Sequence, residues 1–227
     1  MARRPRLRLL VTAGPTREYL DPVRYISNDS SGRMGFAIAR AAVRRGWHVT
    51  LVHGPVSLQP PPGVRAIPVL SAADMLAACR NLWPRHDVLV MAAAVADYTP
   101  VRPARRKHRK SPRDLVLRLT PTSDILKALS ASRRADQVVV GFALEDRTPR
   151  ARALAKLKDK ALDAIVLNRP AAIGAAHSTL DAFVPGEGWQ TWAAAAKTRH
   201  GARLVRLLER LFRKGDRSLF GQRPRRR

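Results

Sequence analysis

The sequence of 227 residues is poor in cysteine and in aromatic residues: it has one cysteine, Cys79, and phenylalanine, tyrosine and tryptophan together make up 5%. A single cysteine excludes an intrachain disulfide framework and a multi-cysteine zinc site, and it favours a reducing compartment, the cytoplasm. The chain also lacks a long apolar run. Its uncharged stretch at residues 49–64 contains four prolines, whereas a membrane-spanning helix needs about 20 mostly apolar residues. We therefore expect no membrane segment.

Acidic residues are scarce as well. Aspartate and glutamate total 17 against 43 lysines and arginines, which gives a net charge of +26; such an excess is typical of proteins that bind nucleic acid. Most of it lies in residues 1–8, 102–113 and 199–227. A basic nucleic-acid-binding Rossmann-like module is therefore one hypothesis, but no recognised binding motif is present and few aromatic residues are available for base stacking. We expect nucleic-acid binding to be non-specific at most.

Short apolar segments alternate with amphipathic ones along the chain. Strands are predicted at 6–12, 48–52, 87–96, 115–119, 137–143 and 164–167, and helices at 33–45, 72–82, 124–131, 151–162 and 201–212. Strands that are buried on both faces read as continuous apolar runs, and alternation with helices gives parallel strands joined by right-handed crossovers. The sequence therefore predicts an α/β fold: a Rossmann-like, doubly wound, mostly parallel sheet with helices on both faces.

We predict one domain, at residues 6–214, between a basic N-terminal arm at 1–5 and a basic, disordered tail at 215–227. A basic flap is predicted at about residues 99–114, because seven basic residues, no acidic one and no apolar period occur between 102 and 113. Residues 170–190 show no clear strand pattern, and no internal repeat is visible.

Two segments follow predicted strands, where a parallel sheet binds its ligands. The first, Gly14 to Arg17 followed by Ser27 to Gly35, contains glycines and hydroxyls that open a helix; they suit a phosphate, and a well-capped helix would explain them equally. The second, Ala92 to Tyr98, combines small residues against which a flat ligand fits with Asp97, which could hold a cation or a hydroxyl. Simple termination of the strand is the alternative.

Lysines form a third candidate group. Lys156 and Lys160 are four residues apart and share one face of a predicted helix, while Lys107 and Lys110 lie in the flap. Phosphate binding and a solvated basic face both explain such patterns. The sequence lacks the G-x-G-x-x-G fingerprint, the P-loop and the G-x-S-x-G elbow, so a dinucleotide-dependent oxidoreductase and a serine hydrolase have no support.

Longer motifs, taken in order, point to a family. They are Ala13-Gly14-Pro15-Thr16-Arg17-Glu18, Asp21-Pro22-Val23-Arg24-Tyr25-Ile26-Ser27-Asn28, Ser30-Ser31-Gly32-Arg33-Met34-Gly35, Ala93-Ala94-Val95-Ala96-Asp97-Tyr98, Lys107 with Lys110, Asp124-Ile125-Leu126, Gly141-Phe142-Ala143 with Glu145, Lys156 with Lys160, and Asn168. Over residues 6–170 the chain closely resembles phosphopantothenate–cysteine ligase, the second half of the bacterial bifunctional coenzyme A biosynthesis flavoprotein. Motifs matched in order are far more specific than one short motif.

The resemblance implies a two-step ligase reaction. The carboxylate of 4′-phosphopantothenate attacks the α-phosphate of CTP, which releases pyrophosphate, and the amine of L-cysteine then displaces CMP from the acyl-cytidylate. Mg²⁺ is expected to enter with the nucleotide, and its protein ligands are unknown. A homodimer is also implied. Because no flavin-dependent decarboxylase domain precedes these motifs, we expect a stand-alone ligase without FMN and a decarboxylase on a separate chain.

The resemblance also implies roles for matched residues. Asn28 and Lys107 are the expected catalytic residues: the Asn28 amide donates to the acyl oxygen, and Lys107 neutralises the phosphates of the nucleotide. Arg24 is expected to bind phosphopantothenate, with Gly14 at the same substrate site. The expected nucleotide-binding residues are Met91, Ala92, Ala93, Asp97, Lys107, Ser123, Asp124, Ile125, Leu126, Phe142, Lys156 and Lys160.

Three positions depart from the family pattern. Arg33 stands where a lysine is common, the flap reads Lys107-His108-Arg109-Lys110, and Ser123 stands where a proline is usual. These departures leave open whether the nucleotide is CTP or another triphosphate such as ATP.

Overall fold

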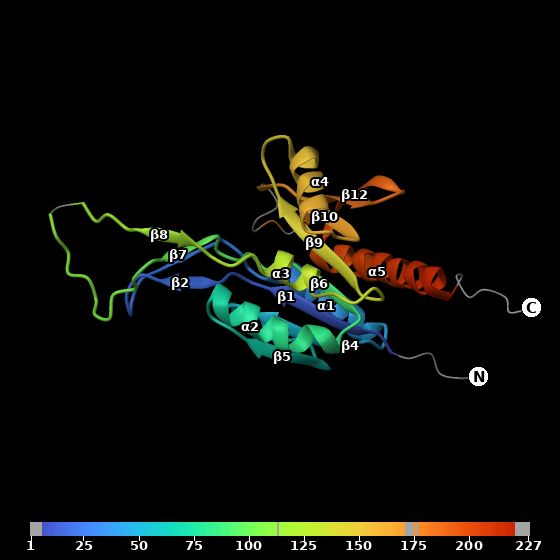
Figure 1. Cartoon of the computed structure of the whole chain (residues 1–227), viewed down its shortest axis with the longest axis horizontal. Coiled ribbons are helices and arrows are strands. Elements are labelled where there is room, and N and C mark those ends of the chain that lie inside the picture. The colour runs from blue at the N-terminus through green and yellow to red at the C-terminus, as the bar shows by residue number, and fades with distance from the viewer. Residues whose placement is uncertain (1–5, 113, 171–174, 176, 221–227) are drawn as a thin grey trace, which may run out of the picture.

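A computed structural model describes residues 6–112, 114–170, 175 and 177–220. Its centre is an eight-stranded sheet in the order β12-β11-β10-β9-β6-β1-β4-β5 (Figure 1). The strands are β1 (Arg8–Ala13), β4 (His48–His53), β5 (Val64–Pro68), β6 (Val88–Met91), β9 (Val138–Leu144), β10 (Ala164–Asn168), β11 (His177–Val184) and β12 (Gly188–Ala196). The six strands from β10 to β5 are parallel, and β11 and β12 are antiparallel. The predicted mostly parallel α/β sheet is confirmed.

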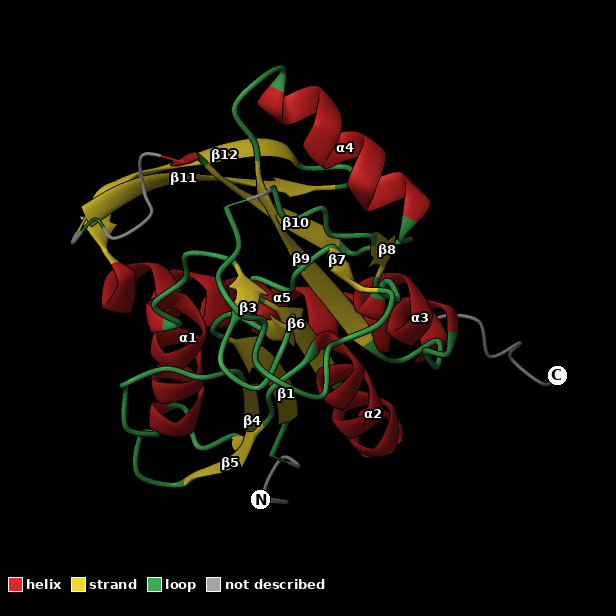
Figure 2. Cartoon of the chain, turned by 90° about the vertical axis from the view of Figure 1, so that its left-hand side faces the viewer, coloured by secondary structure: helices red, strands yellow, loops and turns green. Residues whose placement is uncertain are grey.

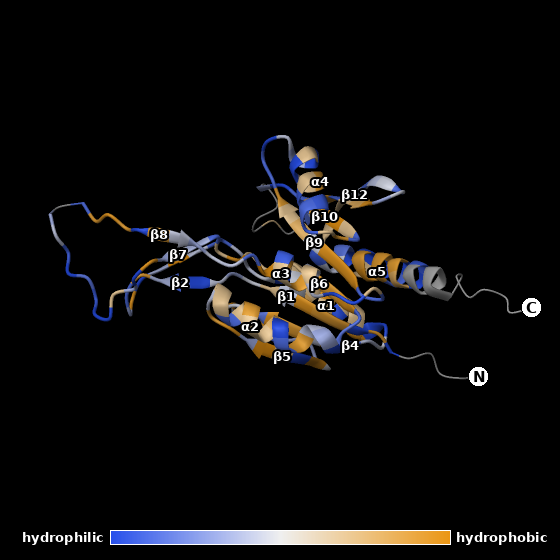
Figure 3. Cartoon of the chain, viewed as in Figure 1, coloured by the Kyte–Doolittle hydropathy of each residue, from blue (hydrophilic) through white to orange (hydrophobic). Residues whose placement is uncertain are grey.

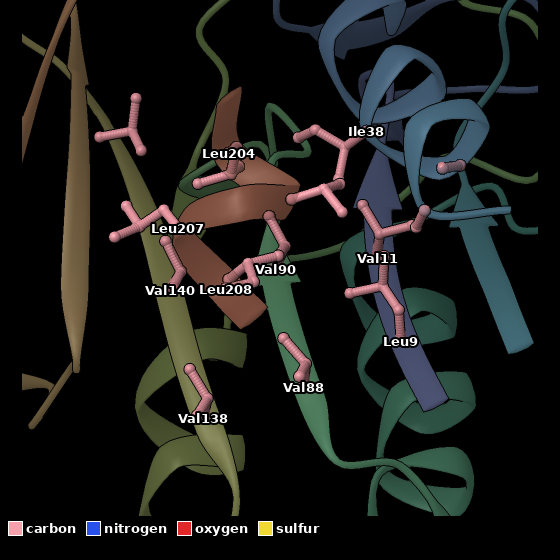
Figure 4. Packing of buried hydrophobic residues seen from close by; sticks show 14 of the residues in the cluster. Leu9, Val11, Ile38, Val88, Val90, Val138, Val140, Leu204, Leu207 and Leu208 are labelled. Atoms are coloured by element: carbon pink, nitrogen blue, oxygen red, sulfur yellow. The ribbon is translucent and has the colours of Figure 1, made fainter. Parts of the chain in front are cut away.

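Helices cover both faces of this sheet (Figure 2). Their bounds are α1 (Arg33–Arg44), α2 (Ala72–Leu82), α3 (Ile125–Ala131), α4 (Pro149–Asp159) and α5 (Lys197–Phe220), with a 3-10 turn, η1, at Trp83–Arg85. The side chains of α1 and α5 belong to one buried apolar cluster, and those of α2, α3 and α4 to a second. Strand β1 contributes to both, because neighbouring side chains on a strand point to opposite faces: Leu9 and Val11 lie in the first cluster (Figure 4) and Leu10 in the second.

Helix α1 is held between β1 and α5 by two glycines. A Cβ atom on Gly35 would lie 2.4 Å from the Cβ atom of Ala13, so β1 and α1 approach too closely there for any side chain. In α5, a Cβ atom on Gly201 would lie 2.7 Å from the carbonyl carbon of Ala37 in α1. These contacts fix where the first turns of both helices lie at the carboxyl edge of the sheet.

Two short antiparallel pairs of strands form a projection from the body, which we call the arm and define as residues 17–27 and 98–121. One pair is β2 (Arg17–Tyr19) with β3 (Tyr25–Ser27), and the other is β7 (Tyr98–Pro100) with β8 (Leu119–Pro121). Figure 1 shows the arm reaching away from the sheet, with the segment between β7 and β8 at its far end. This segment contains the predicted flap.

Several predicted boundaries are wrong. The strand predicted at 87–96 ends at Met91, since from Ala92 the backbone turns to bond with the segment after β1. The strand predicted at 115–119 is displaced to β8, and the last helix begins at Lys197 rather than 201 and continues to Phe220. Strands β5, β11 and β12 were not predicted, and most of the region without clear pattern at 170–190 proves to be an antiparallel hairpin.

The predicted N-terminal arm at 1–5 and residues 221–227 of the predicted tail lie outside the described residues. None of the helices in the described part of the chain combines the length and apolar character that crossing a membrane requires.

Candidate functional site

The main cleft lies where the strand order reverses. From β1 the chain proceeds outward through β4 and β5, and it returns to the other side of β1 for β6, β9 and β10. Open parallel sheets bind ligands at this point, beyond the carboxyl ends of the strands. A cleft of about 740 Å³ occupies the position. Its walls include residues 28–34 before and in α1, 91–95 and 97 after β6, 122–126 at α3, 142–145 in and after β9, Lys156, Lys160, Asn168, Ala175 and Lys197.

The floor of the cleft is backbone, because hydrogen bonds join the segments that follow β1 and β6. Ala94 donates its N–H to the carbonyl of Gly14 at 2.9 Å, and Ala93 donates to the Thr12 hydroxyl at 3.1 Å. Ala96 donates to the hydroxyl of Thr16 at 2.9 Å. The small alanine side chains leave the surface open, so a flat ligand group can approach the main chain closely.

Asn28 lies at this floor, as expected for a site residue. Its side-chain nitrogen Nδ2 donates to the carbonyl oxygens of Val95, at 2.9 Å, and Ala94, at 3.3 Å. An amide nitrogen carries two hydrogens, and both are engaged in these bonds. In this geometry the oxygen atom Oδ1, a hydrogen-bond acceptor, is left for a ligand, and donation from the Asn28 amide to a substrate oxygen stays a prediction.

The first turn of α1 forms the neighbouring wall. Gly32 precedes the helix with φ of 72°, and no side chain caps the helix. Helix N-termini carry unbonded N–H groups and attract anions, so the phosphate interpretation of this segment gains support over a side-chain cap. Gly14 is placed differently. It is buried with φ of 74°, it does not line the cleft, and a Cβ atom there would lie 2.9 Å from Val56. Its observed role is conformational, and direct substrate contact finds no support.

Two lysines of α4 and its end face the cleft from the opposite wall. Lys156 donates from Nζ to the carbonyl of Phe142 at 2.7 Å, and Lys160 pairs with Asp124 at 2.7 Å. Asp124 also caps α3 by accepting a hydrogen bond from the Lys127 N–H at 2.9 Å. The two lysines therefore point into the cleft instead of forming a solvated face, and the expected nucleotide-binding residues of this region lie together.

The pKa of Lys156 reflects a buried position beside a second positive charge. Burial lowers the pKa of Lys156, and the nearby Lys160 lowers it further, while Asp124, Glu145 and Asp97 act in the opposite direction. An anion bound between the two lysines would relieve the repulsion and favour the charged form of Lys156. The wall therefore suits a polyanion such as a nucleotide triphosphate.

Arg24 and Lys107 lie elsewhere. Both line a second pocket of about 440 Å³, on the arm, together with Val23 and residues 108–110. Neither residue lines the cleft that contains Asn28. The structure therefore brings eleven of the twelve expected nucleotide-binding residues together with Asn28. It separates from them the flap lysine, Lys107, and the expected phosphopantothenate-binding arginine, Arg24.

A buried carboxylate organises the arm pocket. Asp21 is 1% exposed, and it accepts hydrogen bonds from the backbone N–H groups of Val23 and Arg24, both at 2.9 Å, and of His108 at 3.2 Å. Arg24 also pairs with it at 2.8 Å. Burial alone would raise the pKa of Asp21, but these hydrogen bonds and the guanidinium of Arg24 outweigh burial and lower the pKa to about 2. Asp21 thus ties the flap to the hairpin of β2 and β3.

Lys197, at the first turn of α5, is a cleft residue that the sequence did not reveal. It donates from Nζ to the hydroxyl of Ser178 at 2.9 Å. No motif marks it, because the strands that place it, β11 and β12, gave no recognisable pattern. Among the described residues, no group of three or more histidine, cysteine, aspartate or glutamate side chains could hold a metal ion.

The open sheet with a cationic cleft at its reversal point defines the chain as a doubly wound α/β protein with a ligand site at the usual position for this fold. Its residues 5–211 match the family described as DNA/pantothenate metabolism flavoprotein C-terminal domain. The chain belongs to this family.

Relatives and solved structures agree with this assignment. The chain is 45% identical over 168 residues to the coenzyme A biosynthesis bifunctional protein CoaBC of Bacillus subtilis, a match that covers 74% of this chain and 41% of that protein. It is also 45% identical, over 76% of this chain and 49% of the relative, to a protein named cysteine/cysteine sulfinic acid decarboxylase from an unknown prokaryotic organism. The chain thus spans half or less of the length of these relatives.

The crystal structure of the C-terminal domain of a CoaBC protein is similar with a TM-score of 0.80 and 35% identity, covering 92% of this chain and 96% of that one. A Cab2 variant in complex with phosphopantothenate-cysteine shares the fold, with a TM-score of 0.76 and 17% identity, covering 95% of this chain and 88% of that one.

Proposed function

We propose that the chain is a phosphopantothenate–cysteine ligase that acts through an acyl-cytidylate in coenzyme A biosynthesis. The observation that carries the proposal is the shared cleft, in which Asn28 on the backbone floor faces the same cavity as the lysine pair Lys156 and Lys160. Membership of the family and 35% identity to a CoaBC C-terminal domain support it. The ligand in the Cab2 neighbour is the product that we expect.

In the first step, the carboxylate oxygen of phosphopantothenate attacks the α-phosphorus of CTP, and the bond to the β-phosphate breaks to release pyrophosphate. Lys156 and Lys160 hold the phosphates and neutralise their charge, an effect that is strong where water is excluded. Mg²⁺ is expected to enter as its complex with CTP.

In the second step, the cysteine nitrogen, once deprotonated, attacks the acyl carbon. The bond between acyl carbon and phosphate oxygen breaks, and CMP leaves. Asn28 is fixed by the carbonyls of Ala94 and Val95, so its Oδ1 is positioned before substrate arrives and can accept a hydrogen bond from the attacking amine. This preorganisation holds the nucleophile at the acyl group.

We further propose a homodimer in which the arm of one copy reaches the cleft of the other. Large apolar side chains are exposed on the arm, including Val116 at 86%, Val23 at 57% and Tyr98 at 53%, and Figure 3 shows apolar stretches beside hydrophilic ones there. Exposed apolar groups of this kind mark interaction surfaces. A second copy that covers them would also bring Lys107 and Arg24 to a cleft that lacks them within one chain.

The test supplies phosphopantothenate, cysteine, Mg²⁺ and each nucleoside triphosphate in turn, and follows pyrophosphate together with the amide product. We expect turnover with CTP above ATP, GTP and UTP. Absence of product with every nucleotide, together with tight, salt-sensitive binding of duplex DNA, would favour a nucleic-acid-binding module instead. The proposal assigns no flavin to this chain, and a flavin absorption spectrum from the purified protein would contradict that part. We expect a separate polypeptide chain to supply the decarboxylase of the pathway.

A further inference from the structure

Lys197 and Arg33 enter the cleft from the first turns of two neighbouring helices. Helices α1 and α5 touch where Gly201 meets Ala37, and both begin at the carboxyl edge of the sheet and run away from it (Figures 1 and 2). Lys197 and Arg33 each precede their contact residue by four positions, which is about 6 Å along a helix axis. Both residues line the cleft, and both lie about one helical turn before this contact between α1 and α5.

The position of Lys197 is fixed by a local irregularity of the sheet. The pairing of β11 with β12 shifts register between Ser178 and Leu180, and such irregularities redirect side chains next to sites. The hydroxyl of the buried Ser178 accepts a hydrogen bond from Lys197 at 2.9 Å, and the Ser178 carbonyl accepts one from Nε2 of the fully buried His200 at 2.5 Å. Burial also lowers the pKa of Lys197. The ammonium group is thus held at the cleft wall by a built network.

Once the carboxylate of phosphopantothenate has become the uncharged acyl group of the acyl-cytidylate, each remaining anionic group of the proposed substrates but one has a cationic partner. The lysines of α4 and its end face the nucleotide phosphates, and Arg24 and Lys107 stand on the arm for the remaining phosphate and the triphosphate. The α-carboxylate of the amino acid has none. Its amine must reach the acyl group beside Asn28, and Asn28 and Arg33 belong to one short segment of the cleft wall. The carboxylate therefore falls on the part of the cleft wall to which Arg33 and Lys197 contribute.

We infer that Lys197, supported by Ser178, binds the α-carboxylate of the amino-acid substrate and selects an α-amino acid over a simple amine. The inference rests on the proposed ligase function and adds a binding residue to it. Lys197 binds substrate directly, whereas Ser178 is a positioning residue that acts through Lys197.

The experiment compares L-cysteine with cysteamine, which has the same amine and thiol but no carboxylate, in the wild type and in Lys197→Ala. We expect Lys197→Ala to raise the KM for cysteine about ten- to a hundred-fold, the range for losing a charge-assisted hydrogen bond. Turnover of cysteamine and the KM values for CTP and phosphopantothenate should stay within about two-fold of wild type. The preference of the wild type for cysteine over cysteamine should thus largely disappear.

Matched variants separate binding from folding. Lys214→Ala removes the same charge from the exposed end of α5, where Lys214 pairs with Glu187, and should leave the preference intact. Lys197→Arg should restore part of it. Ser178→Ala should weaken cysteine binding about three- to ten-fold with no change in the KM for CTP, because it removes a hydrogen bond that positions Lys197 and leaves the charge of Lys197 in place. Thermal unfolding of each variant checks that the fold persists, and Lys197→Gln replaces any variant that fails this check.

Several outcomes would overturn the inference. If folded Lys197→Ala keeps the wild-type preference for cysteine over cysteamine, Lys197 does not bind the carboxylate. A rise in the KM for CTP or for phosphopantothenate alone would assign Lys197 to the triphosphate or to the pantothenate phosphate. If the wild type forms no product with any nucleotide, the proposed function itself fails, which is a different result from loss of amine preference in an active enzyme.

Discussion

In the cleft, the side chains that face the ligand are held by the main chain of the sheet, whereas in the arm they are held by a single carboxylate. Asn28 bonds to two carbonyls at the end of β6, and Lys156 bonds to a carbonyl of β9. The arm instead relies on Asp21, which gathers Arg24 and the flap around it. A sheet with two apolar faces is stable by itself, but two short strand pairs with exposed apolar residues are not. One chain thus contains a half-site held by the main chain of the sheet and a half-site held by one carboxylate.

The largest expected effects come from inactivating the arm and the cleft separately. Lys107→Ala should abolish pyrophosphate release, and Asn28→Ala should retain nucleotide binding but lose product formation, each by about a thousand-fold or more, as for loss of a transition-state contact. Pyrophosphate and amide assays measure the two steps. Near-normal turnover of either variant would remove that residue from the mechanism.

Mixing the two inactive variants then decides whether the arm acts in the other copy. Random exchange of subunits places one intact cleft opposite one intact arm in half of the dimers, so activity should return to about a quarter of the wild-type value. A mixture that stays inactive after exchange has been verified would show that each arm serves its own cleft.

The free energy of unfolding should depend strongly on side chains of the sheet and only weakly on side chains of the arm. Leu89 is fully buried in β6, and Leu89→Ala should lower the free energy of unfolding by about 2–5 kcal/mol. Val116 lies in the arm with 86% exposure, and Val116→Ala should change the free energy of unfolding of the monomer by less than about 0.5 kcal/mol. Urea denaturation measures both. Equal losses would mean that the arm is part of the core.

Within the cleft, a smaller effect is expected for the lysine wall. Lys160→Ala should raise the KM for CTP about ten-fold through loss of one charged contact with phosphate. Lys127→Ala is the matched control, because Lys127 pairs with Asp159 on the surface of the same region. An effect of Lys127→Ala as large as that of Lys160→Ala would point to long-range charge rather than to contact.

The smallest effect is expected from pH. The folded-state pKa of Asp21 is lowered to about 2, so its contribution to the order of the arm is complete above the unfolded value near 4 and is lost as pH falls from about 4 to about 2. Hydrogen exchange should then increase in residues 101–112 before it increases in β1 or β6. Asp21→Asn should show the faster exchange at neutral pH. Simultaneous opening of arm and core would contradict a separately held arm.

Much of the cleft was predictable from the sequence, because its parts obey local rules. The four-residue spacing placed Lys156 and Lys160 on one helix face, and the small residues before Asp97 were recognisable at a strand end, whereas the family resemblance supplied their roles at a ligand. The place of Lys107 was not predictable. Sequence order shows that a basic flap follows β7, but the direction of the arm depends on the buried contacts of Asp21 with residues more than eighty positions away.

Lys197 escaped prediction for a different reason. Strand β12 is half exposed and contains a run of alanines, so it shows neither the alternation of a one-sided strand nor the apolar run of a buried one. The helix that follows was predicted from its leucines, which begin with Leu204, and its first turn therefore went unnoticed. Side chains that are positioned by edge strands with weak hydropathy patterns are therefore difficult to predict from the sequence.

The order in which the two faces of the sheet are covered has a consequence for synthesis. Helices α2, α3 and α4 cover one face before β10 is complete, whereas α5, which covers β6 and β9 on the other face beside α1, is the last element of the fold. Chains fold progressively from the N-terminus as they are made. A nascent chain that has completed β10 therefore still exposes a broad apolar surface and has neither Lys197 nor a closed cleft. The part of the cleft that we assign to the amino acid is therefore completed last, when α5 docks.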